Sequence, residues 1–309
     1  MGSLFWTALA GCQSPDREMD PLSHEMESCI DRAICRKLCL TRAGDRRHIY
    51  VLYCKEKVIP PIAPLPIYRG APMPFDEKYF STHTYADVTF AKYSMYWWSN
   101  RFYAMLARRY GRRGARLLEV GSGMGHLVGQ LSGWFEAYGM DVNHWAVNQS
   151  KEAAERASLQ TASAQELPYE DAVFNVVIIK HIVEHLPDPA KALNEIGRVT
   201  ERGGILILAT PNLGSLLKPW KGDKWIGYQD PTHISLKPPE EWLGLIRAAG
   251  FEFVRVFSDG FWDVPYIPLV PKQIQKLFFG SLGGLQAMTG FVFLPMRWGE
   301  SIVVIARKK

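Results

Sequence analysis

A glycine-rich turn between an apolar segment and an amphipathic one is the part of this sequence best suited to binding a ligand. Residues 117–126 read Leu-Leu-Glu-Val-Gly-Ser-Gly-Met-Gly-His, a strand-like run followed by three glycines at alternate positions. Glycine lets the backbone turn sharply and approach a bound molecule closely because it has no Cβ atom. The turn therefore predicts a ligand-binding loop, with Glu119 in the strand that leads into it.

A carboxylate follows this loop at a spacing that suits a sugar. Asp141 stands 22 residues after Glu119, at the end of the next apolar segment. At the tip of the second strand of a nucleotide-binding fold, a carboxylate can accept hydrogen bonds from both ribose hydroxyls. We predict this role for Asp141, with Val142 beside it; a helix N-cap at the strand-to-helix turn is the alternative.

The position of the third glycine separates two kinds of nucleotide ligand. A dinucleotide fingerprint reads G-x-G-x-x-G, which would need glycine at position 126, where this chain has His126. The chain instead has an acid, Glu119, followed by G-x-G-x-G at 121–125. This pattern resembles motif I of the class I S-adenosylmethionine-dependent methyltransferases, whose loop wraps the methionine part of the cofactor.

Four further blocks resemble those of the same family, in the family's order and spacing. They are Ala-Gln-Glu-Leu-Pro at 164–168, Phe-Asn-Val-Val at 174–177, Val-Glu-His-Leu-Pro-Asp-Pro at 183–189 and Arg-Val-Thr-Glu-Arg-Gly-Gly at 198–204. The resemblance covers about residues 79–306. It implies an α/β fold of Rossmann type, a doubly wound sheet of seven strands with the last one antiparallel, and S-adenosyl-L-methionine as the cofactor.

The resemblance also implies which residues bind the cofactor. They lie in and around the glycine loop, after the second and third strands and at the end of the fourth: Glu119, Gly121, Ser122, Gly123, Gly125, Asp141, Val142, Ser163, Ala164, Gln165 and Lys180. No metal is expected. Two positions depart from the family pattern, because Ser163 stands where an acid is usual and Asn175 where Phe-Asp is usual. A serine binds an amino group less strongly than a carboxylate does, so we expect weaker cofactor binding.

Imidazoles and a carboxylate beyond the fourth and fifth strands are the candidates for acid-base chemistry. Methyl transfer from a sulfonium is an in-line displacement, in which a hydroxyl or phenol acceptor benefits from a general base. His181 and His185 follow the fourth strand, and Asp230 and His233 stand in an Asp-Pro-Thr-His block beyond the fifth. Ligands bind at this edge of open α/β sheets. We predict His233, His185 and Asp230 as catalytic residues, with structural roles for the histidines as the alternative.

These residues need a parallel sheet to bring them to one edge. From residue 116 onward, short apolar segments alternate with amphipathic segments of helix length, which is typical of βαβ units. Strands are predicted at 116–120, 135–140, 159–163, 174–180, 205–210, 251–258 and 301–306. Helices are predicted at 125–134, 143–157, 188–200 and 239–249.

An aromatic segment at 79–113 precedes this core. Its aromatic and apolar side chains recur at spacings of three and four, which predicts a helix. This helix could pack its aromatic face on the domain, cover a flat ligand as an N-terminal lid, or do both. Its basic residues suggest a phosphate-binding face for RNA as an alternative: Arg101, Arg108, Arg109, Arg112 and Arg113.

An apolar insertion at 262–298 stands before the last strand, where such a sheet needs only a short connection. Residues 277–296 carry no charge, but glycines and polar residues interrupt them, so they do not predict a membrane span. One hypothesis is a buried helical cap over the active site. The other is an interfacial element that contacts a membrane and is flanked by Lys272, Lys276 and Arg297. Both favour an apolar acceptor.

The first 72 residues form a predicted appendage to a domain at 73–309. They contain a proline-rich stretch at 59–66 and all five cysteines, whose spacing lacks the C-x2-C pairs of a zinc ribbon. A reduced cysteine set is therefore favoured over a metal site. The Leu-Ala-Gly-Cys at 9–12 is similar to a lipidation motif, but no lysine or arginine precedes it.

The composition excludes a fibrous or disordered chain and names no partner. Of 309 residues, 47% are hydrophobic and 22% charged, and the formal net charge is only +5. We predict a cytoplasmic methyltransferase, with peripheral membrane contact through 262–298, that acts on a small, apolar or lipid-like acceptor. Nucleic acid is not the expected partner. The alternatives are an RNA methyltransferase and a non-catalytic protein that binds the cofactor.

Overall fold

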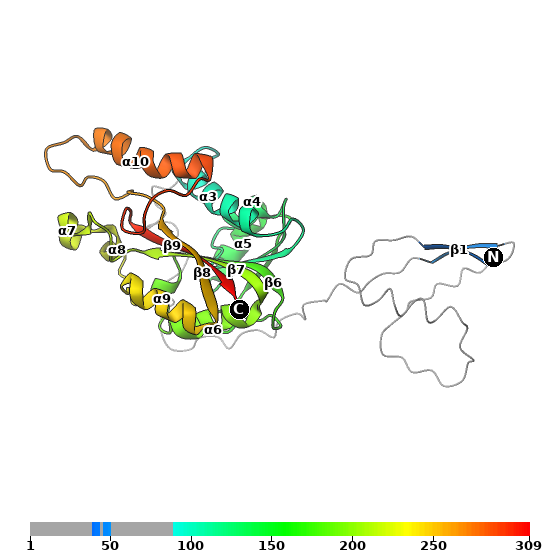
Figure 1. The fold of residues 1–309 in the computed structure, drawn as a ribbon. Helices are drawn as coiled ribbons and strands as arrows, with labels where there is room; N and C mark the ends of the chain where they lie inside the picture. The colour runs from blue at the N-terminus through cyan, green and yellow to red at the C-terminus, as the bar shows by residue number, and fades with distance from the viewer. Residues whose placement is uncertain (1–38, 44–45, 51–88) are drawn as a thin grey trace. The chain divides into compact units, whose positions relative to one another are not determined.

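The chain divides into two compact units, Met1–Pro61 and Ile62–Lys309. The computed structural model describes residues 39–43, 46–50 and 89–309 (Figure 1). In the first unit, β1 (Cys39–Ala43) and β2 (Arg46–Tyr50) form an antiparallel pair. The predictions for the 1–72 appendage, its proline-rich stretch and its cysteine side chains fall outside the described residues and stay predictions.

A seven-stranded sheet forms the centre of the second unit. The strand order is β5-β4-β3-β6-β7-β9-β8, and only β9 runs antiparallel to its neighbours. The strands are β3 (Arg116–Val120), β4 (Glu136–Asp141), β5 (Ser158–Thr161), β6 (Phe174–Lys180), β7 (Thr200–Pro211), β8 (Phe251–Ser258) and β9 (Ser301–Lys308). The predicted fold class and all seven strands are confirmed.

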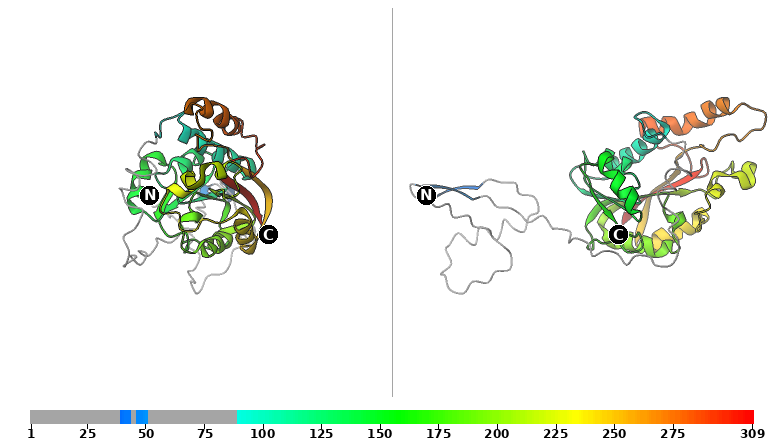
Figure 2. Two further views of the ribbon diagram at one scale, coloured as in Figure 1. Left: turned by 90° about the vertical axis from the view of Figure 1, so that its left-hand side faces the viewer. Right: turned by 180° about the vertical axis from the view of Figure 1, so that it is seen from behind.

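Helices cover both faces of this sheet. Figures 1 and 2 show α3, α4 and α10 over one face and α6 and α9 over the other. The helices are α3 (Met95–Tyr110), α4 (His126–Leu131), α5 (His144–Ala153), α6 (Pro189–Val199), α7 (Lys218–Lys221), α8 (Ile226–Gln229), α9 (Pro239–Ala248) and α10 (Lys272–Thr289), with 3-10 turns η1 (Val183–His185) and η2 (Gly222–Lys224). None of the described helices is both long and apolar enough to cross a bilayer.

The predicted helices are longer than the observed ones, and local caps explain where the observed helices begin. The aromatic segment forms α3 only from Met95, because the Ser94 side chain accepts a hydrogen bond from the Trp97 amide and so caps the helix. The helix ends before Gly111, where a Cβ atom would lie 2.5 Å from Val176. Asn143 caps α5 in the same way as Ser94 caps α3.

Helix α3 packs its apolar face on the sheet, as one of the two predicted roles requires. Its buried Phe102, Tyr103 and Leu106 share one core cluster with alternate residues of β3, β6, β7 and β9. Because strand side chains alternate between faces, Glu119 and Lys180 project toward this same helix. The first turns of α3 therefore lie near the carboxyl edge of the sheet.

The insertion at 262–298 forms α10 and two flanking loops, which buried glutamines tie together. The Gln275 side chain accepts hydrogen bonds from the amides of Tyr266 and Ile267 and donates to the carbonyl of Val270. The Gln286 side chain donates to the Ser258 carbonyl at 2.8 Å and accepts from two backbone amides, at 293 and 294. These amide groups hold α10 against the end of β8.

We predict that Gln286→Leu lowers the free energy of unfolding by about 2 kcal/mol or more, because one carbonyl and two amides lose their partner. Urea unfolding followed by circular dichroism measures the change. Gln273→Leu is the matched control, since Gln273 is exposed on the same helix. Equal stability of the two variants would show that Gln286 does not anchor the insertion.

Candidate active site

The glycine loop is a tight turn held against the end of β4. Gly121, Gly123 and Gly125 have φ values of 77°, 49° and 77°, a region that side chains other than glycine rarely adopt. The amides of Gly121 and Ser122 both donate to the Met140 carbonyl at 2.8 Å. The backbone therefore requires glycines at the turn that the sequence predicts. Its role in ligand binding stays a prediction.

Asp141 connects this loop to the helix that follows β4. One carboxylate oxygen accepts a hydrogen bond from the Gly123 amide at 2.8 Å and the other accepts from the Asn143 amide at 2.9 Å. Burial raises the pKa of Asp141, although these amides lower it. The N-cap of α5 is Asn143, not Asp141, so the alternative role proposed for Asp141 is wrong. Val142, the next residue, is exposed at the same tip.

A buried polar group lies between β3, β6 and α3. The Lys180 ammonium donates to Ser99 at 3.2 Å and to Asn100 at 3.0 Å, and it lies 4.9 Å from the centre of the Tyr103 ring. Burial raises the pKa of Glu119 and lowers that of Lys180, and the attraction between the two charges opposes both shifts.

Three buried polar atoms beside the loop have no hydrogen-bond partner within the described part of the chain. They are Glu119 Oε2, Ser122 Oγ and Asn100 Nδ2. Buried donors and acceptors are nearly always paired in folded proteins. Such atoms beside a glycine turn fit a polar ligand that supplies the missing partners.

The two departures from the family pattern have local explanations. The Ser163 hydroxyl accepts a hydrogen bond from the Gln165 amide and so fixes the turn that carries Ala164. Asn175 stands at the opposite end of β6 from Lys180, where it donates to Glu201 at 2.6 Å and accepts from the Arg112 amide. Asn175 therefore lies away from the loop edge and gives no reason to expect weaker cofactor binding.

The histidine-bearing turn η1 lies directly against the glycine loop. A Cβ atom added at Gly121 would lie 2.2 Å from Ile182, the residue before this turn. His181 takes a left-handed conformation, with φ of 53°, to lead the chain out of β6. The structure thus brings the predicted catalytic histidines to the edge where the loop sits.

Glu184 is the buried centre of this turn, and its side chain is fully inaccessible. One carboxylate oxygen accepts from His181 Nδ1 at 3.2 Å and the other accepts from the Thr210 hydroxyl at 3.0 Å. Burial acts to raise the pKa of Glu184, but the hydrogen bond and charge of His181 and the charge of His185 lower it overall. Glu184 is therefore an ionised carboxylate that orders the imidazoles around it.

Thr232 links His185 to Asp230. His185 Nδ1 lies 2.9 Å from the Thr232 hydroxyl and 3.2 Å from its carbonyl, which can only accept. The Thr232 hydroxyl donates in turn to Asp230. This chain of contacts leaves Nε2 as the nitrogen of His185 that accepts a proton.

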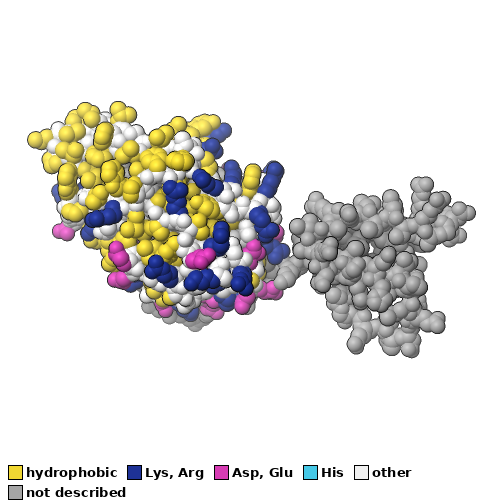
Figure 3. Space-filling model, viewed as in Figure 1, with side chains coloured by type: hydrophobic (Ala, Val, Ile, Leu, Met, Phe, Trp, Pro, Cys, Tyr) yellow, Lys and Arg dark blue, Asp and Glu magenta, His cyan; other side chains and the backbone are white. Residues whose placement is uncertain are grey.

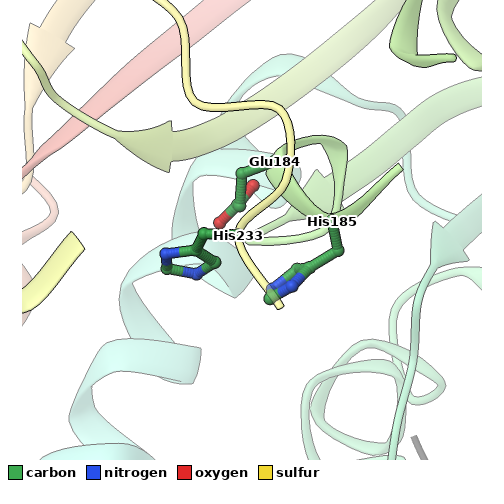
Figure 4. Close-up of side chains that lie close together, drawn as sticks. All are labelled: Glu184, His185 and His233. Carbon is green, nitrogen blue, oxygen red and sulfur yellow. The ribbon is translucent and has the colours of Figure 1, made fainter. Parts of the chain in front are cut away.

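His233 lies beside His185, with ring centres 4.6 Å apart (Figure 4). Its Nδ1 donates to the Gly227 carbonyl at 2.7 Å, so its Nε2 is the accepting nitrogen. A proton taken up there would lie close to Asp230, whose Oδ2 atom is 3.9 Å away. The three predicted catalytic residues are therefore brought together by the fold.

Glu184, His185 and His233 each offer one ligand atom, and these atoms lie within 4.8 Å of one another (Figure 4). Two imidazoles and a carboxylate could hold a divalent cation. Each of these side chains also has a hydrogen-bond partner in the protein that can orient it for proton transfer: His181 and Thr210 for Glu184, Thr232 for His185 and Gly227 for His233. We therefore interpret the group as acid-base machinery, and the predicted absence of a metal stays a prediction.

Two residues of this site were missed in the sequence. Glu184 lies in the Val-Glu-His block and Thr232 in the Asp-Pro-Thr-His block, yet neither was assigned a role. The signal available was their position next to His185 and His233. One partner of each is local, His181 for Glu184 and Asp230 for Thr232. The other partners, Thr210 and His185, come from distant segments that no spacing rule could name.

The arginines of the alternative RNA-binding face are engaged within the chain. Arg108 donates to the Gln130 carbonyl at 2.6 Å, and Arg112 pairs with Glu201 at 3.5 Å. Arg101 stacks near Trp97 and Trp98. Arg109, Arg112 and Arg113 are nevertheless exposed, so the RNA-binding alternative stays a hypothesis that these contacts do not test.

The chain is also similar in sequence to a known protein family. A family model described as "Methyltransferase domain" matches residues 97–256. A phosphatidylethanolamine N-methyltransferase of Cereibacter sphaeroides is 29% identical over 102 residues, which is 31% of this chain and 50% of that protein. A chloroplastic tocopherol O-methyltransferase of Arabidopsis thaliana is 33% identical over 121 residues, or 34% of each chain.

The same comparison extends to solved structures. A SAM-dependent methyltransferase from Thermotoga maritima aligns with a TM-score of 0.50 at 20% identity, covering 69% of this chain and 89% of that one. At this identity the likeness concerns the fold. The chain spans between half and about three fifths of the first curated relatives it matches.

We predict that Asp141→Asn weakens binding of S-adenosylhomocysteine at least about tenfold, because one charged hydrogen bond contributes about 1.5 kcal/mol or more. Isothermal titration calorimetry measures the affinity, and circular dichroism checks the fold. Asp171→Asn is the control, since Asp171 is exposed and pairs with Arg198. Affinity within about threefold of wild type would remove Asp141 from the ribose site.

We also predict that His185 makes the fold less stable in acid. Burial lowers its pKa, although the charges of Glu184 and Asp230 oppose this and that of His233 adds to it. Below about pH 6.5 the unfolded chain binds a proton at this imidazole that the folded chain does not. The free energy of unfolding therefore decreases as the pH is lowered.

His185→Gln should therefore lose less stability than wild type between about pH 7 and about pH 5.5. Urea unfolding at the two pH values gives both slopes, and the exposed His144→Gln serves as the control. The same pH dependence in His185→Gln and wild type would contradict the lowered pKa.

Proposed function

The chain belongs to the class I S-adenosylmethionine-dependent methyltransferases, and we propose that it methylates a small, apolar or lipid-like acceptor. The family uses S-adenosyl-L-methionine as its cofactor, so a protein that only binds this molecule is not the favoured hypothesis. The observation that carries the proposal is the contact between the glycine loop and the histidine turn, through Gly121 and Ile182. In this proposal, the contact keeps the cofactor loop and the acid-base groups at the same edge of the sheet.

The residues at the loop fit the cofactor. Asp141 is placed to accept the ribose hydroxyls, and Ser122, Glu119 and Asn100 supply buried polar atoms that lack partners among the described residues. Ala164 and Gln165 continue the site along the turn after β5, and Lys180 closes it beside α3. When bound, S-adenosylmethionine supplies an electrophilic methyl group on its sulfonium.

His233 is the proposed general base. The Gly227 carbonyl holds its Nδ1 proton, so Nε2 takes the proton that the acceptor loses when it forms its new bond to the methyl carbon. Asp230 then stabilises the positive imidazole from 3.9 Å. Burial lowers the pKa of His185, which favours the neutral form of this neighbouring ring.

Two observations support an apolar acceptor. The insertion at 262–298 exposes large apolar side chains, among them Leu277 and Phe278. Two of the relatives are named for the methylation of phosphatidylethanolamine and of tocopherol, both of them lipids. Peripheral membrane contact through this insertion belongs to the same proposal, and the cytoplasmic location stays a prediction.

We expect purified protein to transfer label from methyl-labelled S-adenosylmethionine to the lipid fraction of a cell extract, because the acceptor is apolar. Lipid, RNA, protein and small-molecule fractions are counted separately. Label in the RNA or protein fraction alone would overturn the acceptor class. A chelator such as EDTA should leave the rate unchanged, since the proposed chemistry uses a proton acceptor and no metal.

His233→Gln should lower the rate on the same fraction at least about a hundredfold, the usual contribution of a general base. Binding of S-adenosylhomocysteine should stay within about twofold of wild type, because His233 does not hold the cofactor. His144→Gln, an exposed histidine, is the control. A full rate in His233→Gln would remove the base from the proposal and leave the acceptor class standing.

A further inference from the structure

Helix α10 buries two glutamines and exposes several large apolar side chains. Gln275 and Gln286 are 2% and 0% exposed, whereas Leu277 and Phe278 are 77% and 69% exposed. A helix on the surface of a protein in water normally has the opposite arrangement. The orientation is fixed, because the two glutamines hold backbone groups of both flanking loops.

The outward side chains form one continuous stripe. Within α10 they recur at spacings of three, four and seven, and the loops at both ends extend the stripe. Its members, which we call the apolar insertion face, are Leu269, Ile274, Leu277, Phe278, Leu285, Met288 and Phe291. Figure 3 shows hydrophobic side chains gathered over α10 and its neighbourhood. An exposed patch of this kind marks an interaction site.

The charges around this face have one sign. Lys272, Lys276 and Arg297 are all exposed. The only acid between 262 and 298 is Asp263, and it pairs with Lys221 at 3.0 Å. The insertion that carries the face is therefore basic: at about 100° per residue, Lys272 and Lys276 lie on the side of α10 away from the stripe, and the insertion has no unpaired carboxylate to oppose their charge.

We propose that the apolar insertion face docks on the surface of an anionic lipid bilayer, with α10 lying in the interface. Interfacial helices of this kind combine buried apolar area with attraction between basic side chains and anionic lipids. No helix among the described residues is long and apolar enough to span a bilayer, and the proposed contact is with the bilayer surface. The inference rests on the proposed lipid-like acceptor, which such docking would bring to the enzyme from the bilayer.

A second copy of the chain suits this face less well than a bilayer does. In a two-fold symmetric dimer the same patch meets itself. Such a contact would bury the face against another copy of the same basic insertion, which has no unpaired acid to neutralise Lys272, Lys276 and Arg297. An anionic membrane instead supplies the opposite charge.

Liposome flotation of the full chain tests the proposal. We expect the protein to float with vesicles of phosphatidylcholine and phosphatidylglycerol, to float less with phosphatidylcholine alone, and to dissociate as salt is raised. The double variant Leu277→Glu and Phe278→Glu should lower the bound-to-free ratio at least about tenfold, since it places two acids in the interface. Val254→Glu is the matched control, an exposed apolar residue on β8.

Charge-reversal variants measure the electrostatic contribution to vesicle binding. Lys272→Glu with Lys276→Glu should weaken binding to the anionic vesicles about thirtyfold, because each basic group near the surface contributes about 1 kcal/mol. Arg202→Glu, an exposed residue near the start of β7, should change binding little. Equal loss in both variants would show a general charge effect and overturn the docking surface.

Two other results would overturn the proposal. In the first, the protein does not float at all and sediments as a dimer that Leu277→Glu and Phe278→Glu break, which would assign the face to a second copy. Alternatively, the double variant could float as wild type does. Flotation needs no turnover, so it is independent of the extract labelling: lipid labelling without flotation rejects the docking alone, and flotation without labelling rejects the acceptor alone.

Discussion

The buried carboxylate of Glu184 is the constraint on which the rest of the candidate site depends. A charge that is fully removed from water must be paired and hydrogen-bonded, or it costs several kcal/mol. Glu184 meets this requirement with His181 at the end of β6 and Thr210 at the end of β7. Its backbone carbonyl also accepts from the Ser235 amide. One residue thus joins two strands and the loop that carries Asp230 and His233.

The two halves of the site are coupled by close packing. The glycine loop can lie against Ile182 only because Gly121 has no side chain, and Asp141 holds the loop in place through the Gly123 amide. The insertion is tied to the same edge from the other side, since the Asn212 side chain donates to the carbonyls of Met296 and Gly299. Cofactor loop, acid-base groups and insertion therefore meet where β3, β6 and β7 end.

Much of this arrangement could be predicted from the sequence, because it follows from local pattern. Apolar runs alternating with helical segments predicted the seven strands, and the spacing of Asp141 after Glu119 predicted a carboxylate at the tip of β4. Helix ends were less predictable: α3 begins at Met95 because Ser94 caps it and ends where Val176 leaves no room beside Gly111. The buried cap and the interfacial element both stay hypotheses, to which the structure adds that Leu277 and Phe278 on the outer side of α10 are exposed.

The sequence alone determined the elements, their order and the chemistry available at their ends, because periodicity, glycines and caps act over a few residues. Only the tertiary structure decided which groups meet. The contact of Glu184 with Thr210, that of His185 with Thr232, and the closeness of His185 to His233 each join segments far apart in sequence. The outward side of α10 was decided in the same way, because the backbone groups that Gln275 and Gln286 must satisfy lie in loops that only the fold brings beside the helix.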